Sequence, residues 1–156
     1  NIKLEKSFLE KARKNFTVAN LLFKISEQEE LKKALNLANE FEMFELVIIN
    51  SYYSMYSSAL ATLSKLSFKS KSHATTIAVL EYNYVQRKKG LETEHIQKLT
   101  KAHNVSEELI TKLIKTKTKR EAAQYDATPS ISKENAKTAL EDAEEFITKI
   151  EEILQP

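Results

Sequence analysis

The near absence of glycine and proline is the feature that most constrains this chain, which has one glycine and two prolines in 156 residues. The tight turns of a β-sandwich or β-barrel depend on these residue types, so we expect neither fold. One glycine is also too few for a glycine-rich phosphate-binding loop. The chain has no cysteine, which excludes a disulfide, a thiolate metal site and a thiol nucleophile.

Apolar residues recur at helical spacing along most of the chain, and no segment has the pattern of a strand. We therefore predict an all-α protein: one domain over residues 1–156, folded as an up-and-down bundle of about five to six helices. Ser72 and Ser132 have the position of helix N-caps. Ser26, with Glu29 three residues later, predicts a capping box that opens a short helix through Ala38.

Two separate helices are expected in the third quarter of the chain, where Gly90 ends the preceding helix. The first covers roughly residues 93–102. The second begins at Ser106 and ends before Pro129. Its predicted buried arc consists of Leu109, Ile110, Leu113 and Ile114.

The segment 46–64 contains no charged residue, although it has the length of a membrane span. Five serines, an asparagine and three tyrosines argue against a span, because their polar groups would lie in hydrocarbon. A helix without a charged face is usually covered on both sides. We therefore expect a central helix whose small-residue face packs against another helix or a second subunit. The residues assigned to a dimer interface on this face are Asn50, Ser54, Ser57, Ser58 and Ala61.

Polar residues replace the apolar arc near the end of the helix that follows Ser106. They are Lys117, Arg120, Glu121 and Gln124, with Tyr125 at the edge of the arc. Inward-facing polar groups must be paired or must line a cleft. Two explanations remain open: the helix end protrudes past the core, or it contributes to a polar cleft or subunit interface centred on Arg120 and Tyr125.

The sequence resembles the HEPN domains of prokaryotes, small helical proteins often encoded beside a minimal nucleotidyltransferase. Blocks in the order of that family carry the resemblance: residues 9–13, the Ser-Tyr-Tyr block at 51–60, Lys-Ser-His at 71–73, Arg-Glu-Ala-Ala-Gln-Tyr-Asp at 120–126, and the tail 132–154. The segment between Ser26 and Glu45 is longer than the usual connection. The resemblance implies a homodimer in which two arginine-containing motifs face each other.

The resemblance also implies a site for RNA chemistry that needs no metal or cofactor. In the ribonuclease branches the motif is an arginine followed, after four to six residues, by a histidine. Arg120 matches the arginine, whereas Tyr125 occupies the histidine position and Gln124 replaces an aspartate of the stand-alone form. A tyrosine with an ordinary pKa of about 10 is a poor proton acceptor at neutral pH, where histidine titrates. Binding with cleavage and binding without cleavage therefore both remain open.

The resulting hypothesis is a nucleotide- or RNA-binding member of a toxin–antitoxin-like pair with a nucleotidyltransferase. The alternative is a non-catalytic dimeric scaffold whose cleft only binds a partner or a nucleotide. The candidate catalytic residues are Arg120, Tyr125 and His73, and the candidate nucleotide- or RNA-binding residues are Lys117, Arg120, Gln124, Lys69 and Lys71.

The other aromatic and histidine residues suggest simpler roles. Tyr52 and Tyr56 are expected in the core, Tyr53 stays open between packing and base stacking, and His95 and His103 lack the spacing of a metal site. The first 14 residues mix apolar and charged side chains, unlike a signal peptide. We accordingly expect a cytoplasmic protein without a membrane association, in agreement with the lack of cysteine.

Overall fold

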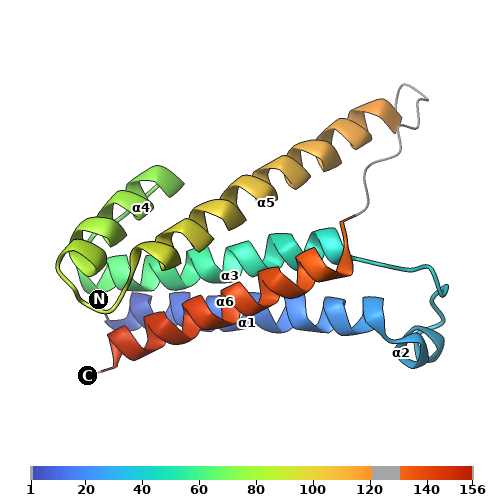
Figure 1. Ribbon diagram of the computed structural model, residues 1–156, viewed down its shortest axis with the longest axis horizontal. Helices are drawn as coiled ribbons and strands as arrows, with labels where there is room; N and C mark the ends of the chain where they lie inside the picture. The colour runs from blue at the N-terminus through green and yellow to red at the C-terminus, as the bar shows by residue number, and fades with distance from the viewer. Residues whose placement is uncertain (1, 121–130, 156) are drawn as a thin grey trace.

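A computed structural model describes residues 2–120 and 131–155, with side chains for all of these except residues 116–120. The described residues contain helices and no strand, which confirms the all-α prediction (Figure 1). In chain order the elements are α1 (Ile2–Glu27), α2 (Glu29–Ala34), α3 (Phe44–Lys65), α4 (His73–Leu80), the π-helical segment η1 (Glu81–Gln86), α5 (Thr93–Arg120) and α6 (Lys133–Leu154).

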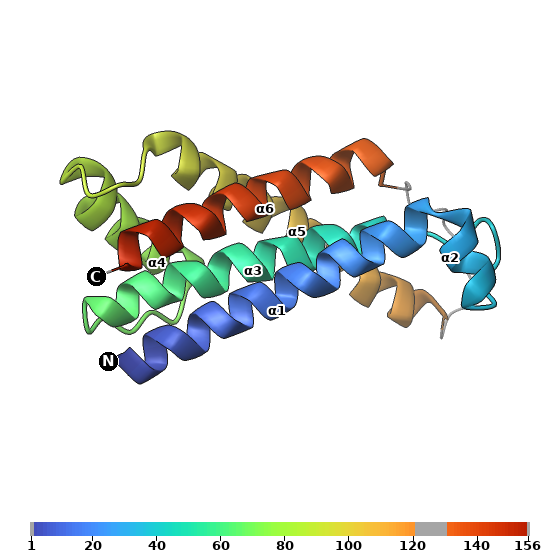
Figure 2. The same cartoon turned by 90° about the horizontal axis from the view of Figure 1, so that it is seen from below.

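The helices α1, α3 and α6 lie side by side and form the body of the bundle, with α1 antiparallel to α3 (Figures 1 and 2). Sequence periodicity explains this arrangement best for α6, because apolar residues that recur there at helical spacing are buried. The buried residues of α6 are Ala136, Leu140, Ala143, Phe146, Ile147, Ile150 and Leu154. Arg13 also links α1 to α6, because its guanidinium forms an ion pair with the carboxylate of Glu151 in α6.

Helix α3 is the central element, as the absence of charge predicted. Buried residues occur around most of its circumference, and α1, α4, α5 and α6 all contact it. Its buried hydroxyls are mostly satisfied within the helix: Ser54 Oγ donates to the carbonyl of Ser51 at 2.6 Å, and Ser58 Oγ to that of Met55 at 2.7 Å. None of the helices in the described residues is long and apolar enough to cross a membrane.

The small-residue face of α3 is covered by the chain itself. Ser54, Ser58 and Ala61 are 0% exposed and Ser57 is 4% exposed within a single copy of the chain. These four residues therefore pack against neighbouring helices within one copy of the chain, and their part in a dimer interface stays a prediction. Small side chains there let α3 approach the adjoining helices closely. Asn50 is half-buried, and its amide donates to the carbonyl of Leu46 at 2.8 Å.

The start of the second helix differs from the sequence prediction. Ser26 lies within α1, where its hydroxyl donates to the carbonyl of Leu22 and accepts from the backbone N–H of Met43, both at 2.8 Å. The serine thus joins the end of α1 to the chain entering α3 instead of capping α2. Helix α2 ends at Ala34, earlier than predicted, and Asn36 follows with a positive φ of 55°.

Helix α5 is continuous where two helices were expected. Ser106, the predicted cap, is fully buried inside it, because tertiary packing around Leu109 favours an unbroken helix there. The predicted buried arc is wrong for Leu113 and Ile114, which are 51% and 61% exposed. This part of α5 extends beyond the other helices of the bundle (Figure 1). Where this helix ends relative to Pro129 falls outside the described residues.

Both predicted N-caps at Ser72 and Ser132 are confirmed. Ser72 Oγ accepts the backbone N–H of Thr75 at 3.1 Å, and Ser132 Oγ accepts that of Asn135 at 3.1 Å. Helix α4 then passes directly into η1, whose last residue precedes Gly90 by a short turn. Gly90 has a φ of 106°, a left-handed conformation that side chains disfavour.

Replacing Gly90 by alanine should destabilise the fold by about 1 kcal/mol or more, because alanine resists the positive φ. An added Cβ would also lie 2.7 Å from Cγ1 of Ile153, so the end of α6 would have to shift. Urea unfolding followed by circular dichroism measures the loss. Lys88→Gly is the control: Lys88 has a φ of 51°, and glycine there should leave stability unchanged or increase it. Equal stability of Gly90→Ala and the parent would contradict this account.

Candidate functional site

Two histidines from different helices lie face to face beside the central helix. His73 is the first residue of α4, and His103 lies in the middle of α5. Their ring centroids are 3.8 Å apart and their planes differ by 9°, so the imidazoles are stacked. The residues are thirty positions apart in sequence (103 − 73), and the turn after η1 brings them together.

Two tyrosines of α3 pack against this pair of histidines. Tyr52 lies against His103 with ring centroids 5.4 Å apart, and Tyr56 lies against His73 at 6.3 Å with an angle of 29° between the rings. These two tyrosines are four residues apart, so they project from the same face of α3. The Tyr52 hydroxyl and Nδ1 of His103 are 3.0 Å apart and share a hydrogen bond. We call these four residues the His–Tyr cluster.

Burial keeps two members of the cluster, His73 and Tyr52, uncharged at pH 7. Burial, with a smaller contribution from His103, lowers the pKa of His73 to about 4, so its imidazole is uncharged. Both ring nitrogens of His73 are buried and have no hydrogen-bond partner in the part of the chain that the structure describes. Burial also raises the pKa of the Tyr52 hydroxyl above its ordinary value, which keeps the phenol protonated. The site therefore offers flat aromatic rings, of which His73 and Tyr52 are uncharged at pH 7.

Charged and exposed groups surround the cluster. Lys69 and Lys71 are exposed in the turn that leads into α4. Tyr53 is 41% exposed and its ring centroid lies 5.3 Å from that of Tyr52. Glu107, one turn after His103 in α5, is close enough to contribute to the raised pKa of Tyr52. A nucleic-acid base could stack on such aromatic groups while lysines contact the backbone phosphates.

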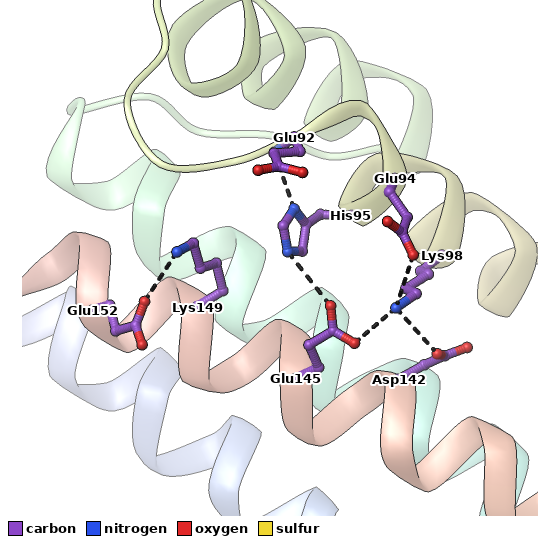
Figure 3. A network of polar contacts seen from close by, with 8 residues as sticks. All are labelled: Glu92, Glu94, His95, Lys98, Asp142, Glu145, Lys149 and Glu152. Atoms are coloured by element: carbon purple, nitrogen blue, oxygen red, sulfur yellow. Dashed lines mark hydrogen bonds and ion pairs between the residues drawn. The ribbon is translucent and has the colours of Figure 1, made fainter.

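A network of polar contacts holds the start of α5, the helix that carries His103, against α6 (Figure 3). Lys98 Nζ lies 2.7 Å from Oε2 of Glu145 and 3.6 Å from Oδ1 of Asp142. His95 Nδ1 accepts the backbone N–H of Glu92 at 3.0 Å, and its Nε2 lies 3.7 Å from Oε1 of Glu145. The hydrogen bond from Lys98 lowers the pKa of Glu145.

The structure describes only part of the predicted site, and the function of every residue in it stays a prediction. It places His73 in the His–Tyr cluster, with Lys69 and Lys71 in the turn just before it. The side chains of Lys117 and Arg120 and the whole of Gln124 and Tyr125 lie outside the described residues. Their roles stay predictions.

Sequence reasoning missed the partnership of His103 with His73. Tyr52 is buried as predicted and Tyr56 is half-buried, so the tyrosine pattern indicated the face of α3 correctly. No spacing rule connects His103 to that face, because η1 and the loop at residues 87–92 separate it from His73. Within the described residues, no group of three or more histidine, cysteine, aspartate or glutamate side chains is placed to hold a metal ion.

Comparison with protein families assigns the chain to a family. The model of the HEPN domain matches residues 26–153, which is most of the chain. The chain therefore belongs to the HEPN-domain family, as the resemblance of its sequence blocks indicated. This family is associated with RNA or nucleotide binding and with ribonuclease or toxin–antitoxin roles, and its domains commonly form dimers. No curated protein sequence matches the chain.

The uncharged state of His73 in the folded protein predicts how the stability of the fold depends on pH. The pKa of His73 is about 4 in the folded protein, whereas the ordinary histidine value of 6.5 applies to the unfolded chain. Folding therefore favours the uncharged form of the His73 ring. Its contribution to the free energy of unfolding is fully present above pH 6.5 and is lost as the pH falls toward 4. Urea midpoints of the parent should thus decrease from pH 7 to pH 5, and His73→Gln should reduce that decrease.

The matched control is Ala74→Gln, an exposed neighbour that introduces the same side chain without removing the imidazole. Its pH dependence should equal that of the parent. Glu145 has a lowered pKa and loses its contribution only below its ordinary value of 4.5, outside the range measured. An unchanged slope in His73→Gln would show that the ring is not held in its neutral form by the fold.

Proposed function

We propose that the protein binds RNA or nucleotides at the His–Tyr cluster. The observation that carries the proposal is the stack of His73 on His103 above Tyr52, next to the basic turn before α4. Stacking of one base on an aromatic side chain contributes about 1–3 kcal/mol without a sequence requirement. Lys69 and Lys71 supply charge for phosphates.

The motif at Arg120 is a second phosphate-binding element in this proposal, seventeen residues after His103 (120 − 103) along the chain. Its guanidinium can hold a phosphate through two parallel hydrogen bonds, with Lys117 and Gln124 as neighbouring polar groups. In this proposal Arg120 and Tyr125 take the positions of the family motif. The protein acts in the cytoplasm as one member of a toxin–antitoxin-like pair with a nucleotidyltransferase. Co-purification with a small nucleotidyltransferase encoded beside this gene would support the pairing, and its absence from the purified complex would count against it.

The second candidate is a metal-independent ribonuclease. The uncharged nitrogens of His73 favour it, since attack by a 2′-hydroxyl needs a proton acceptor. Against it, a pKa of about 4 makes His73 a weak base at pH 7, and Tyr125 stands at the histidine position of the motif. Binding without cleavage is therefore the preferred function. A dimeric scaffold that binds only a protein partner is the remaining alternative.

Replacing Lys69 and Lys71 together by alanine should weaken binding of a mixed single-stranded RNA pool. Each lost phosphate contact reduces the magnitude of the slope of log affinity against log salt concentration by about 0.7. The magnitude of this slope should therefore be smaller by about 1.4 for the double variant than for the parent. Fluorescence anisotropy at several salt concentrations measures the slope. The control is Lys24→Ala with Lys33→Ala, exposed lysines that make the same charge change near α2. An equal effect of both pairs would indicate nonspecific attraction.

The same RNA pool, incubated in EDTA, separates the three functions. Bound but intact RNA agrees with the preferred proposal. Cleavage by the parent that Arg120→Ala abolishes would establish the ribonuclease. If RNA is neither bound nor cleaved, the dimeric scaffold is the one of the three functions that remains. Circular dichroism of Arg120→Ala is needed beside each assay, because loss of folding would mimic loss of function.

We further propose a homodimer that uses the exposed apolar end of α5 in place of the small-residue face of α3. Leu113 and Ile114 are more than half exposed although they continue the apolar arc of Leu109. Burying such side chains against a second copy would remove apolar surface from water. The Arg120 motif, two turns further along α5, would then lie near the dimer axis.

Leu113→Glu should shift the protein from dimer to monomer, since a buried carboxylate without a partner is unfavourable. Light scattering coupled to size-exclusion chromatography gives the mass of each form, which is 17.9 kDa for one chain. Thr111→Glu is the control, an equal charge change at an exposed position of α5 outside the arc. A parent that is already monomeric at all concentrations would refute the dimer.

A further inference from the structure

A cavity of about 280 Å³ lies between α3, α5 and α6. Helix α5 crosses α3 and α6 at an angle (Figures 1 and 2). The apolar part of the cavity wall is formed by Ile48, Met55, Ala102, Val105, Ile131 and Ala139. Its volume is close to the lower end of the range for small-molecule sites, which favour positions between helices of a bundle.

The cavity wall includes a buried hydroxyl that has no partner among the described residues. Ser51 is 1% exposed, and its Oγ forms no hydrogen bond with any of them. Other hydroxyls of α3 differ: those of Ser54, Ser58 and Thr62 each donate to a backbone carbonyl three residues earlier. A buried hydroxyl without a partner costs about 1–3 kcal/mol. Ser51 is therefore an exception that a ligand atom in the cavity would explain.

Three charged side chains line the cavity, namely Lys98, Lys101 and Asp142. Lys98 is bonded most closely to Glu145, outside the lining, and its Nζ also lies 3.6 Å from Oδ1 of Asp142. Lys101 is exposed, forms no ion pair with a described residue, and acts on Asp142 through its charge, which lowers the pKa of that carboxyl against the effect of burial. The lining itself thus holds two cations and one carboxylate, and a ligand with one negative charge would offset the difference.

We infer that this cavity binds a small hydroxylated organic acid, with one carboxylate, an apolar body and a hydroxyl group. The apolar body packs against residues such as Met55 and Val105. The ligand hydroxyl pairs with Ser51 Oγ, which can donate and accept. The carboxylate lies near Lys101. This site is separate from the His–Tyr cluster and does not depend on RNA binding.

Three related probes test each part of this inference. 4-Hydroxyphenylacetate has the hydroxyl, the ring and the carboxylate. Phenylacetate lacks the hydroxyl, and 4-hydroxyphenethyl alcohol lacks the charge. Calorimetric titration of the purified protein should give the highest affinity for 4-hydroxyphenylacetate. Removing the hydroxyl should lower affinity about fivefold, the effect expected for one hydrogen bond.

Ser51→Ala should reduce affinity for 4-hydroxyphenylacetate about fivefold and leave that for phenylacetate unchanged. Lys101→Gln should reduce affinity for both acids and leave that for the alcohol unchanged. Ser54→Ala is the matched control, because Ser54 is as deeply buried on the same helix but its hydroxyl is already satisfied. It should leave the affinity for all three probes unchanged.

A measurement on the parent protein keeps the test independent of variant folding. Binding of 4-hydroxyphenylacetate should shift the methyl NMR signals of Ile48, Met55 and Val105, which line the cavity. Shifts confined to other methyl groups would overturn the inference. Equal affinity for all three probes, or no binding of any, would overturn it as well.

Discussion

The fold depends on the packing of one uncharged helix on nearly all sides. Because α3 carries no charge between residues 46 and 64, α1, α6, α4 and α5 can all lie against it without burying an ion. Its serine and threonine hydroxyls would be costly in that position if unpaired, and donation to carbonyls within the helix removes most of that cost. The helix is thus polar in composition yet suited to a core.

Both candidate sites follow from the position of α5 across this central helix. On the side of α4, His103 meets His73 above the tyrosines of α3. On the side of α6, the same helix leaves the cavity that Ser51 lines. The ion pairs of Lys98 and Glu145 hold the start of α5 against α6 and so influence the geometry of both places. The proposed RNA site and the proposed ligand site therefore depend on the same contacts between α5 and α6, although they have no residue in common.

Local signals predicted the structure well wherever the interaction itself is local. A serine that accepts the N–H three residues later needs no tertiary partner, and both Ser72 and Ser132 were identified correctly. The same type of residue misled at Ser26 and Ser106. Ser26 bonds to Met43 across a loop, and Ser106 is buried by neighbouring helices. The sequence pattern does not contain those contacts.

The sequence by itself determined the helical class, the central place of α3, the buried stripe of α6 and the family. These follow from periodicity, from the lack of charge and from ordered motifs, all of which are properties of neighbouring residues. Only the tertiary structure decided that His73 stacks on His103 and that Leu113 lies beyond the core. Such pairings depend on how loops and helix crossing angles place distant residues, and neither is encoded by spacing along the chain.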